Sequence, residues 1–233
     1  MADNIMSRVL YRDALMLVLD KPAGLAVHRD GRRGEGETLT DHLDGLRFGL
    51  PRRPEIVHRL DRETSGCLVM GRHARALARL NSLFRDREVD KVYWALVEGG
   101  PEQDEGEIAL ALAPEDPRRG WRMRPDPAGQ PALTRWRVLG RGPVTWLELR
   151  PITGRTHQLR VHCAAIGWPI LGDALYGSGQ RSGPGLMLHA RSVTVPLYPK
   201  KAPIIVEAPV PERMAAGLAQ CGWKPSETPD PTG

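Results

Sequence analysis

The sequence has few cysteines and no long apolar run. Only three of its 233 residues are cysteines, Cys67, Cys163 and Cys221, and no two of them form a Cys-x-x-Cys pair. This odd, scattered set favours neither a disulfide framework nor a thiolate zinc site. No apolar stretch approaches the roughly 20 residues that a membrane-spanning helix needs, and residues 1–8 lack the apolar segment of a secretory signal. We therefore expect a cytoplasmic protein with no membrane partner.

Metal and cofactor motifs are also missing, and aromatic residues are scarce. His157 and His162 are five residues apart, whereas the histidines of a helical zinc pair are four apart. We therefore expect no metal site; no nucleotide-binding or redox motif is present either. Besides six tryptophans the chain has only four tyrosines and two phenylalanines, which gives no sign of an aromatic platform for single-stranded nucleic acid.

Charged residues are plentiful and their balance is basic. The chain is 41% hydrophobic and 26% charged, as in soluble globular proteins, and its formal net charge is +5. A basic balance favours a polyanionic partner, because neutralising phosphates releases their counterions. This composition is compatible with RNA binding without requiring it.

The apolar patterns predict an α+β fold in a single domain over residues 1–223, followed by a disordered tail at 224–233. Strands are expected at residues 15–20, 25–28, 66–71, 91–98, 134–139, 144–150, 186–195 and 204–207. Helices are expected at residues 38–46, 72–88, 155–166 and 212–221. The segment 100–131 is rich in proline, glycine and charge, so we interpret it as a surface loop or hairpin region with a short strand at 108–112.

Asp61 is the residue on which a functional interpretation depends. It precedes the buried strand expected at 66–71 and is flanked by His58, Arg59 and Arg62. A carboxylate in this setting is either a nucleophile or base held by cations, or one member of a structural ion pair. For an acidic residue considered alone, the structural alternative is the stronger one.

A second candidate is Arg160, within the helix expected at 155–166. That helix is apolar nearly all round, so it is predicted to be buried, and a buried guanidinium needs a carboxylate partner. Asp61 is the obvious partner, although a structural pair and a catalytic pair remain equally good interpretations. Tyr93, on the strand at 91–98, is either core packing or a side chain that stacks on a flipped base or moves a proton.

Three motifs, in this order along the chain, resemble those of the RluA family of pseudouridine synthases. They are HRLDRETSG at residues 58–66, KxYxALVxG at 91–99 and GRTHQLRxH at 154–162. Weaker matches lie at 21–25, 171–177 and 188–190, so that the resemblance spans residues 11–215. It implies a mixed, largely antiparallel central sheet with flanking helices, and a cleft across the sheet that holds the catalytic aspartate.

The resemblance also implies roles for individual residues. Asp61 would be the catalytic nucleophile and Arg160 its ion-pair partner. Tyr93 would lie against the uracil ring and would also serve in proton transfer. Arg59 would insert into the RNA where the target uridine is extruded. The full set of substrate contacts implied in this way is Arg59, His58, Arg62, Thr64, Arg155, His157 and Leu188. The reaction converts uridine to pseudouridine without a cofactor.

RNA is therefore the expected partner, as a stem-loop of transfer RNA, ribosomal RNA or both, bound by a monomer. The small N-terminal RNA-binding module of many relatives is not seen, so RNA affinity is expected from the loop 29–37, the helix 72–88 and the region 118–124. On that helix Arg72, Arg75 and Arg79 share one face, which either contacts phosphates or is simply solvated. Two other functions remain as alternatives: a non-catalytic RNA-binding protein on the same scaffold, and a glycoside hydrolase that uses Asp61 with Glu63.

Overall fold

The computed structural model describes residues 5–29, 36–116, 122–177 and 185–225. Most of the predicted disordered tail lies outside the described residues, as do residues 30–35 of the basic loop and 118–121 of the region 118–124. In the ranges that are described, no helix is both long enough and apolar enough to cross a membrane.

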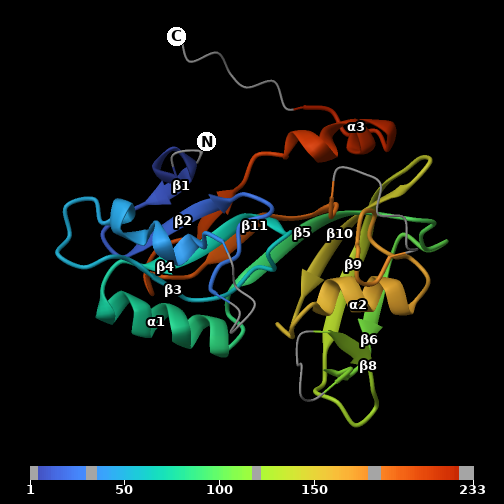
Figure 1. Ribbon diagram of the computed structural model, residues 1–233, viewed down its shortest axis with the longest axis horizontal. Helices are drawn as coiled ribbons and strands as arrows, with labels where there is room; N and C mark the ends of the chain where they lie inside the picture. The colour runs from blue at the N-terminus through green and yellow to red at the C-terminus, as the bar shows by residue number, and fades with distance from the viewer. Residues whose placement is uncertain (1–4, 30–35, 117–121, 178–184, 226–233) are drawn as a thin grey trace.

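A ten-stranded sheet organises the molecule (Figure 1). Its strands are β1 (Val9–Arg12), β2 (Met16–Lys21), β3 (Glu55–Ile56), β4 (Ser65–Gly71), β5 (Asp90–Val97), β6 (Glu105–Ala109), β9 (Leu133–Arg141), β10 (Thr145–Pro151), β11 (Leu188–Val195) and β12 (Ile204–Glu207). Their order is β1-β2-β4-β11-β5-β10-β9-β6, with β12 beside β11 and β3 beside β4. Only the pair β4–β11 is parallel. The predicted α+β class with a mixed, largely antiparallel sheet is confirmed.

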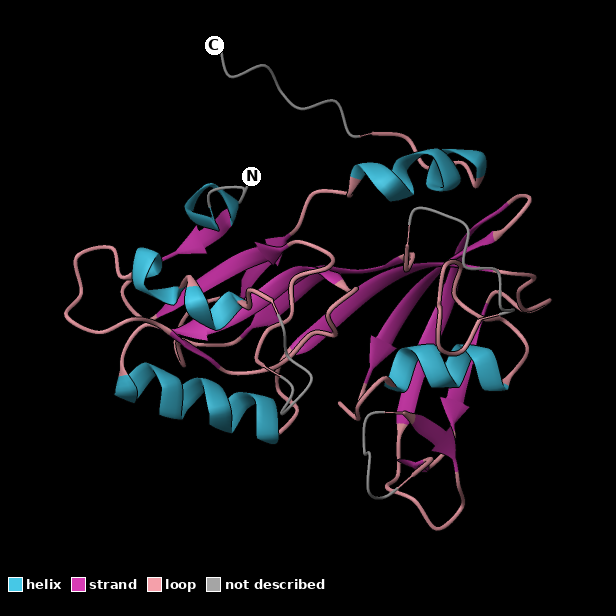
Figure 2. Ribbon diagram, in the orientation of Figure 1, coloured by secondary structure: helices cyan, strands magenta, loops and turns pink. Residues whose placement is uncertain are grey.

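Among the described residues, three α-helices flank this sheet, as Figure 2 shows. They are α1 (Ala74–Arg85), α2 (Gln158–Ala165) and α3 (Glu212–Gln220). In the view of Figure 1, α1 lies below the left-hand strands, α2 lies in front of β9 and β10, and α3 lies above the sheet. Each helix is held by apolar side chains on its inner face, such as Leu80 and Leu83 of α1 and Met214 and Leu218 of α3. The helices expected at 72–88 and 212–221 are therefore present with shorter ends.

Several short elements differ from the predictions. The strand expected at 25–28 is absent, and only one bridge joins Ala26 to Thr38. The helix expected at 38–46 is instead two 3-10 turns, η3 (Leu39–Asp41) and η4 (Leu43–Leu46). The carboxylate of Asp41 accepts from both the backbone N–H and the hydroxyl of Thr38, so Thr38 caps the first turn. Gly45 lies in the middle of this short segment and disfavours a continuous α-helix.

The segment 100–131, predicted as a surface loop or hairpin region with one short strand, contains three short strands in its described residues. It contributes β6 to the edge of the large sheet, and β7 (Leu112–Pro114) pairs with β8 (Met123–Pro125) as a separate two-stranded sheet. A hairpin was one of the expected alternatives, but the first strand lies at 105–109 rather than 108–112, and its place in the large sheet was not expected. The proline, glycine and charge of this segment mask the short alternation of its strands.

Arg72 does not belong to an exposed arginine face. It is 9% exposed, and its guanidinium donates hydrogen bonds to the backbone carbonyls of Asp13, Arg47 and Phe48. It precedes α1, which begins at Ala74, so it does not share the helical periodicity that grouped it with Arg75 and Arg79. The last two are exposed.

Strand β4 leads out of the Asp61 run and is buried along all seven of its residues. At its start Gly66 has φ +107°, and a Cβ at this position would lie 2.2 Å from the carbonyl oxygen of Ala190 on β11. Only glycine permits this backbone conformation together with this close approach of the two parallel strands. The glycine that ends the first motif is therefore required by the sheet.

We expect Gly66→Ala to lower the free energy of unfolding by several kcal/mol, about 3 or more, since it adds a steric clash to an unfavourable φ. Chemical denaturation measures the loss. The matched control is Gly45→Ala in η4, where the nearest atom to a new Cβ is 3.9 Å away and φ is not positive. Equal stability of the two variants would contradict this account of Gly66.

Candidate active site

A cleft of about 630 Å³ opens between the end of α1 and the beginning of α2. Its walls come from residues 57–61 and Thr64, the C-terminal turn of α1, strand β5, the segment 151–160 and Leu188 of β11. The three motifs of the sequence thus meet at one place. Among the predicted site residues, all except Arg62 line this cleft.

Asp61 lies in the loop between β3 and β4, and its side chain is 17% exposed. The backbone N–H of Thr64 donates to the Asp61 carbonyl (3.1 Å), which closes a turn over residues 61–64. The next carbonyl, that of Arg62, accepts from Lys21 Nζ (3.0 Å) and from the N–H of Gly24 (2.9 Å). The turn that carries Asp61 is therefore tied to the loop after β2.

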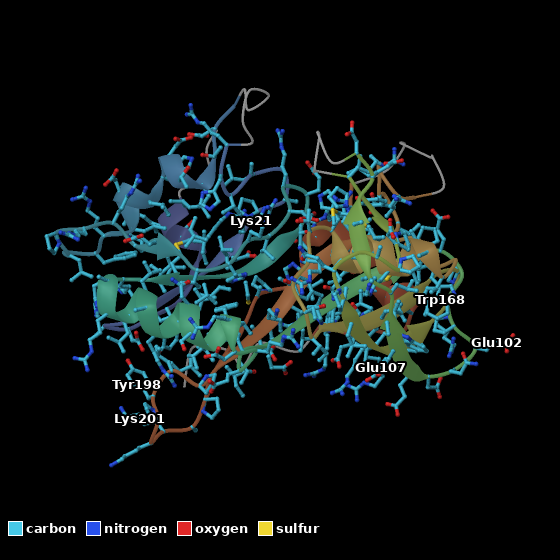
Figure 3. The ribbon with its side chains drawn as sticks, turned by 90° about the horizontal axis from the view of Figure 1, so that it is seen from below. Lys21, Glu102, Glu107, Trp168, Tyr198 and Lys201 are labelled. Carbon is cyan, nitrogen blue, oxygen red and sulfur yellow. The ribbon has the colours of Figure 1, made fainter. Side chains whose placement is uncertain are left out.

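Lys21 is the centre of this attachment. It is completely buried and also donates to the carbonyls of Pro22 and Leu25, both at 2.8 Å. Figure 3 shows it within the ribbon, whereas Lys201 lies at the periphery. Burial lowers the pKa of Lys21 to about 7, although the nearby charges of Glu63 and Asp61 oppose that shift.

The Asp61 carboxylate accepts a hydrogen bond from Arg160 Nη1 at 3.3 Å. Arg160 lies on α2 with its side chain 6% exposed, as the apolar character of this helix predicted. The structure therefore brings together the two residues that the sequence paired.

Asp173, however, is the stronger partner of Arg160, and the sequence did not predict that. It accepts from Nε at 2.8 Å and from Nη2 at 2.7 Å, a bidentate pair with Asp173 1% exposed. Burial disfavours the Arg160 charge, but the bonds and charge of Asp173, together with Asp61, raise its pKa above the ordinary value. Asp173 thus fixes the guanidinium so that one nitrogen remains for Asp61.

Helix α2 starts at Gln158, three residues later than predicted, because His157 adopts a left-handed conformation (φ 52°, ψ 18°). This is an unusual backbone state for a residue other than glycine, and such states concentrate at functional sites. The turn is held by the side chain of Gln158, whose Oε1 accepts from the Thr153 hydroxyl (2.6 Å) and the Arg155 N–H (3.0 Å).

In this conformation the His157 ring lies beside the Asp61–Arg160 pair. Its Nε2 is 3.9 Å from the Asp61 carboxylate, and its Nδ1 shares a hydrogen bond of 2.8 Å with the Tyr176 hydroxyl. Burial and the positive charge of Arg160 lower the pKa of His157, although Asp61 opposes them. Tyr176 lies in one of the weaker sequence matches, but nothing in the sequence linked it to His157.

Tyr93 and Leu188 form the floor of the cleft from two adjacent strands, β5 and β11. Both are buried. Burial raises the pKa of Tyr93, and the charge of Asp61 raises it further. The phenol is therefore protonated at neutral pH, so it can donate a proton or a hydrogen bond but is not poised as a base.

His58 lines the cleft but is already engaged by the protein. Its Nε2 accepts the backbone N–H of Val69 (2.9 Å), and its ring stacks on Phe84 with centroids 4.7 Å apart. Burial, with the charge of Lys91, lowers the pKa of His58 to about 3. The ring is therefore neutral and braces the 58–61 run against β4.

Two arginines from the first motif behave differently. Arg62 turns away from the cleft, where its Nε donates to the carbonyl of Gly24 (2.9 Å). Arg59 is exposed at the mouth of the cleft and makes no hydrogen bond or ion pair with any described residue. Arg155 faces it across the opening, with Nε 3.2 Å from the Pro131 carbonyl. The mouth thus presents cations that the protein itself does not neutralise.

Within the described residues, no cluster of three or more histidine, cysteine, aspartate or glutamate side chains is placed to hold a metal ion. Glu63, the second carboxylate of the glycoside hydrolase hypothesis, is 51% exposed, pairs loosely with Arg62 (3.8 Å) and does not line the cleft.

The fold and the site define a class. A family model described as RNA pseudouridylate synthase matches residues 15–165, and the chain belongs to this family. The dual-specificity RNA pseudouridine synthase RluA of Escherichia coli K12 is 38% identical over 194 residues, which are 80% of this chain and 85% of that protein. The resemblance to the RluA family is confirmed.

Other relatives agree. An RNA pseudouridine synthase of Zymomonas mobilis, described as uncharacterized, is 46% identical over 211 residues, covering 88% of this chain and 94% of that protein. Among solved structures, human RNA pseudouridylate synthase domain containing 4 is 27% identical with a TM-score of 0.77, and the match covers 94% of each chain.

Proposed function

We propose that this RNA pseudouridine synthase uses Asp61 as its nucleophile, with Arg160 as the cation that pairs with and orients the carboxylate. The single observation that carries the proposal is the Asp61–Arg160 hydrogen bond inside the cleft, with Arg160 fixed from behind by Asp173. A reactive carboxylate must be held in one geometry, and this arrangement supplies that.

The reaction is an isomerisation, so its atoms balance without a co-reactant. The bond between uracil N1 and ribose C1′ breaks, the ring turns, and a bond forms between C5 and C1′. The C5 proton leaves and N1 gains a proton. Asp61 attacks either the ribose or the uracil ring, or acts as a base on a glycal route. Tyr93 lines the cleft and is protonated at neutral pH. In this proposal it packs against the uracil ring and takes part in the proton transfers.

The target uridine must leave its stack to reach a side chain inside the cleft. The Arg59 side chain is exposed at the cleft mouth and has no partner among the described residues, which supports its insertion into the RNA in place of the extruded base. Arg155 and His157 contact the nucleotide from the opposite wall, with Leu188 below it. The contacts of His58 and Arg62 with the protein favour positioning roles for these two residues.

We further propose a stem-loop of transfer or ribosomal RNA as substrate, since unstacking a loop uridine costs less than opening a duplex. The enzyme would act in the cytoplasm as a monomer. Size-exclusion chromatography with light scattering checks the monomer, and a mass above one chain would refute it.

The function is tested by incubating the protein with unmodified RNA labelled with tritium at C5 of uridine. Wild-type protein is expected to release tritium, because C5 loses its hydrogen when it bonds to C1′. RNA binding without any release would favour the non-catalytic alternative. Chemical mapping of pseudouridine in the reacted RNA then identifies the target position.

A further inference from the structure

The cleft lies across the junction between β4 and β11. Among the described strands, this pair is the one ladder that joins β1, β2, β3 and β4 to the rest of the sheet. Asp61 enters the cleft from the loop before β4, whereas Tyr93 and Leu188 line it from β5 and β11. The distance between Asp61 and the floor of the cleft therefore depends on how β4 and β11 are held together.

The β4–β11 junction is short. It consists of two register pairs, His189 with Ser65 and Ala190 with Gly66. By contrast, β2 pairs with β4 over six positions, and so does β5 with β11. A parallel ladder is also slightly less stable per residue than an antiparallel one. A side chain that binds both strands would therefore add to the rigidity of this junction.

Arg213 is such a side chain. It is the second residue of α3, which lies above the sheet in Figure 1. Its Nη2 donates to the hydroxyl of Ser65 on β4 at 2.8 Å. Longer bonds run to the carbonyls of Leu188 (3.5 Å) and Leu186 (3.4 Å), at the start of β11 and just before it. Every hydrogen bond between Arg213 and a described residue thus goes to one side or the other of the junction.

Ser65 connects Arg213 to the ladder itself. The residue is 4% exposed, and its hydroxyl oxygen lies 2.8 Å from Nδ1 of its register partner His189. A guanidinium can only donate, so Ser65 accepts from Arg213 and can donate to His189. Because side chains alternate along a strand, His189 and Ser65 lie on the opposite face of the sheet from Leu188. Arg213 therefore binds the junction from behind the cleft, and it does not line the cleft.

We propose that Arg213 is a positioning residue that fixes the separation of Asp61 from Tyr93 and Leu188. The inference rests on the proposed function, because an effect on turnover requires Asp61 to react in this cleft. Ser65 directly follows the turn over residues 61–64, so a movement of Ser65 also moves that turn. A displacement of about 1 Å can lower a reaction rate about 10²-fold. Arg213 lies outside the three sequence motifs and outside residues 15–165, which the family model matches.

Arg213→Met removes the guanidinium and keeps most of the apolar stem. Well below the melting temperature of the variant, the single-turnover rate constant of pseudouridine formation is expected to fall about tenfold, with RNA affinity within about threefold of wild type. The matched control is Arg191→Met. Arg191 of β11 donates to the Ala208 carbonyl (2.7 Å) and pairs with Glu207, so it does not bridge to β4. This control is expected to lower stability and leave the rate constant unchanged.

Ser65→Ala tests whether Arg213 acts through the junction, because it removes the partner on β4. If the two side chains act through their shared hydrogen bond, Arg213→Met lowers the rate constant less in the Ser65→Ala background than in the wild type. Fully additive effects of the two substitutions would overturn the proposal. So would a wild-type rate constant in Arg213→Met, whatever its melting temperature.

Hydrogen exchange gives a measurement that needs no activity. In Arg213→Met, the backbone amides of residues 65–67 and 188–190 are expected to exchange faster than in the wild type, whereas those of β9 and β10 keep their rates. Unchanged exchange at the junction would also overturn the proposal. Absence of tritium release by the wild-type protein would instead refute the proposed function, and hydrogen exchange would still decide whether Arg213 stabilises the junction.

Discussion

Asp61→Asn is expected to reduce pseudouridine formation by at least about 10³-fold, because asparagine keeps the size of the side chain but cannot act as a carboxylate nucleophile. RNA affinity should be retained, since the cations at the cleft mouth are unchanged. Tritium release under single-turnover conditions measures the first quantity, and filter binding of the same RNA measures the second. Stability should change little, because the polar contact to Arg160 can be kept by the amide oxygen.

The matched control is Glu63→Gln, which neutralises a carboxylate two residues away that is exposed and outside the cleft. It should retain nearly full activity. Wild-type rates in Asp61→Asn would show that Asp61 takes no part in the chemistry. A large loss in Glu63→Gln would instead revive a two-carboxylate mechanism.

Asp173→Asn is expected to lower both stability and turnover. Removing one partner from a buried ion pair costs about 3–5 kcal/mol when the remaining charge is left uncompensated. Here the decrease in the free energy of unfolding should lie toward the lower end of this range, because Asp61 still contacts Arg160. We expect kcat to fall about 10- to 100-fold with little change in KM, because a guanidinium that is no longer held on two sides lets the Asp61 carboxylate leave its reactive orientation.

Asp173 is proposed as a positioning residue, and the kcat effect separates this role from a merely structural one. Activity is measured well below the melting temperature of the variant, so that both proteins are folded. Glu148→Gln is the control, a carboxylate that is 12% exposed and pairs with Arg150 and Arg137 away from the cleft. If an Asp173 variant has lower stability but wild-type kcat, Asp173 has a structural role and does not position Asp61 for catalysis.

The sequence predicted the members of the central ion pair because each carries a local signal. Arg160 falls in a helix that is apolar nearly all round, and Asp61 precedes a strand that proves to be buried at every position. A cation and an anion in such places need each other, whatever the fold. The central strand β5 was equally visible, because both of its faces carry apolar or aromatic residues.

What the sequence did not reveal depends on contacts between distant segments. The bidentate contact of Asp173 follows from how the turn after α2 folds back, and Asp173 lies in a polar, glycine-rich stretch with no periodicity. Arg72 points into the protein because its guanidinium donates hydrogen bonds to three backbone carbonyls of other segments. The left-handed turn at His157 was not predicted, because the helical sequence pattern begins at residue 155 whereas the helix itself begins at Gln158. The local sequence pattern determines where helices and strands form, whereas these three contacts and conformations are determined by tertiary packing.

The place of β11 in the sheet has a consequence for synthesis. It lies between β4, which follows the Asp61 loop, and β5, which carries Tyr93, so these two strands are joined to each other through residues 188–195. A chain that has emerged from the ribosome only as far as α2 already contains all three motifs but lacks Leu188 and the strand that joins β4 to β5. We therefore expect the cleft to be completed late in folding, when a strand from the last quarter of the chain enters the sheet.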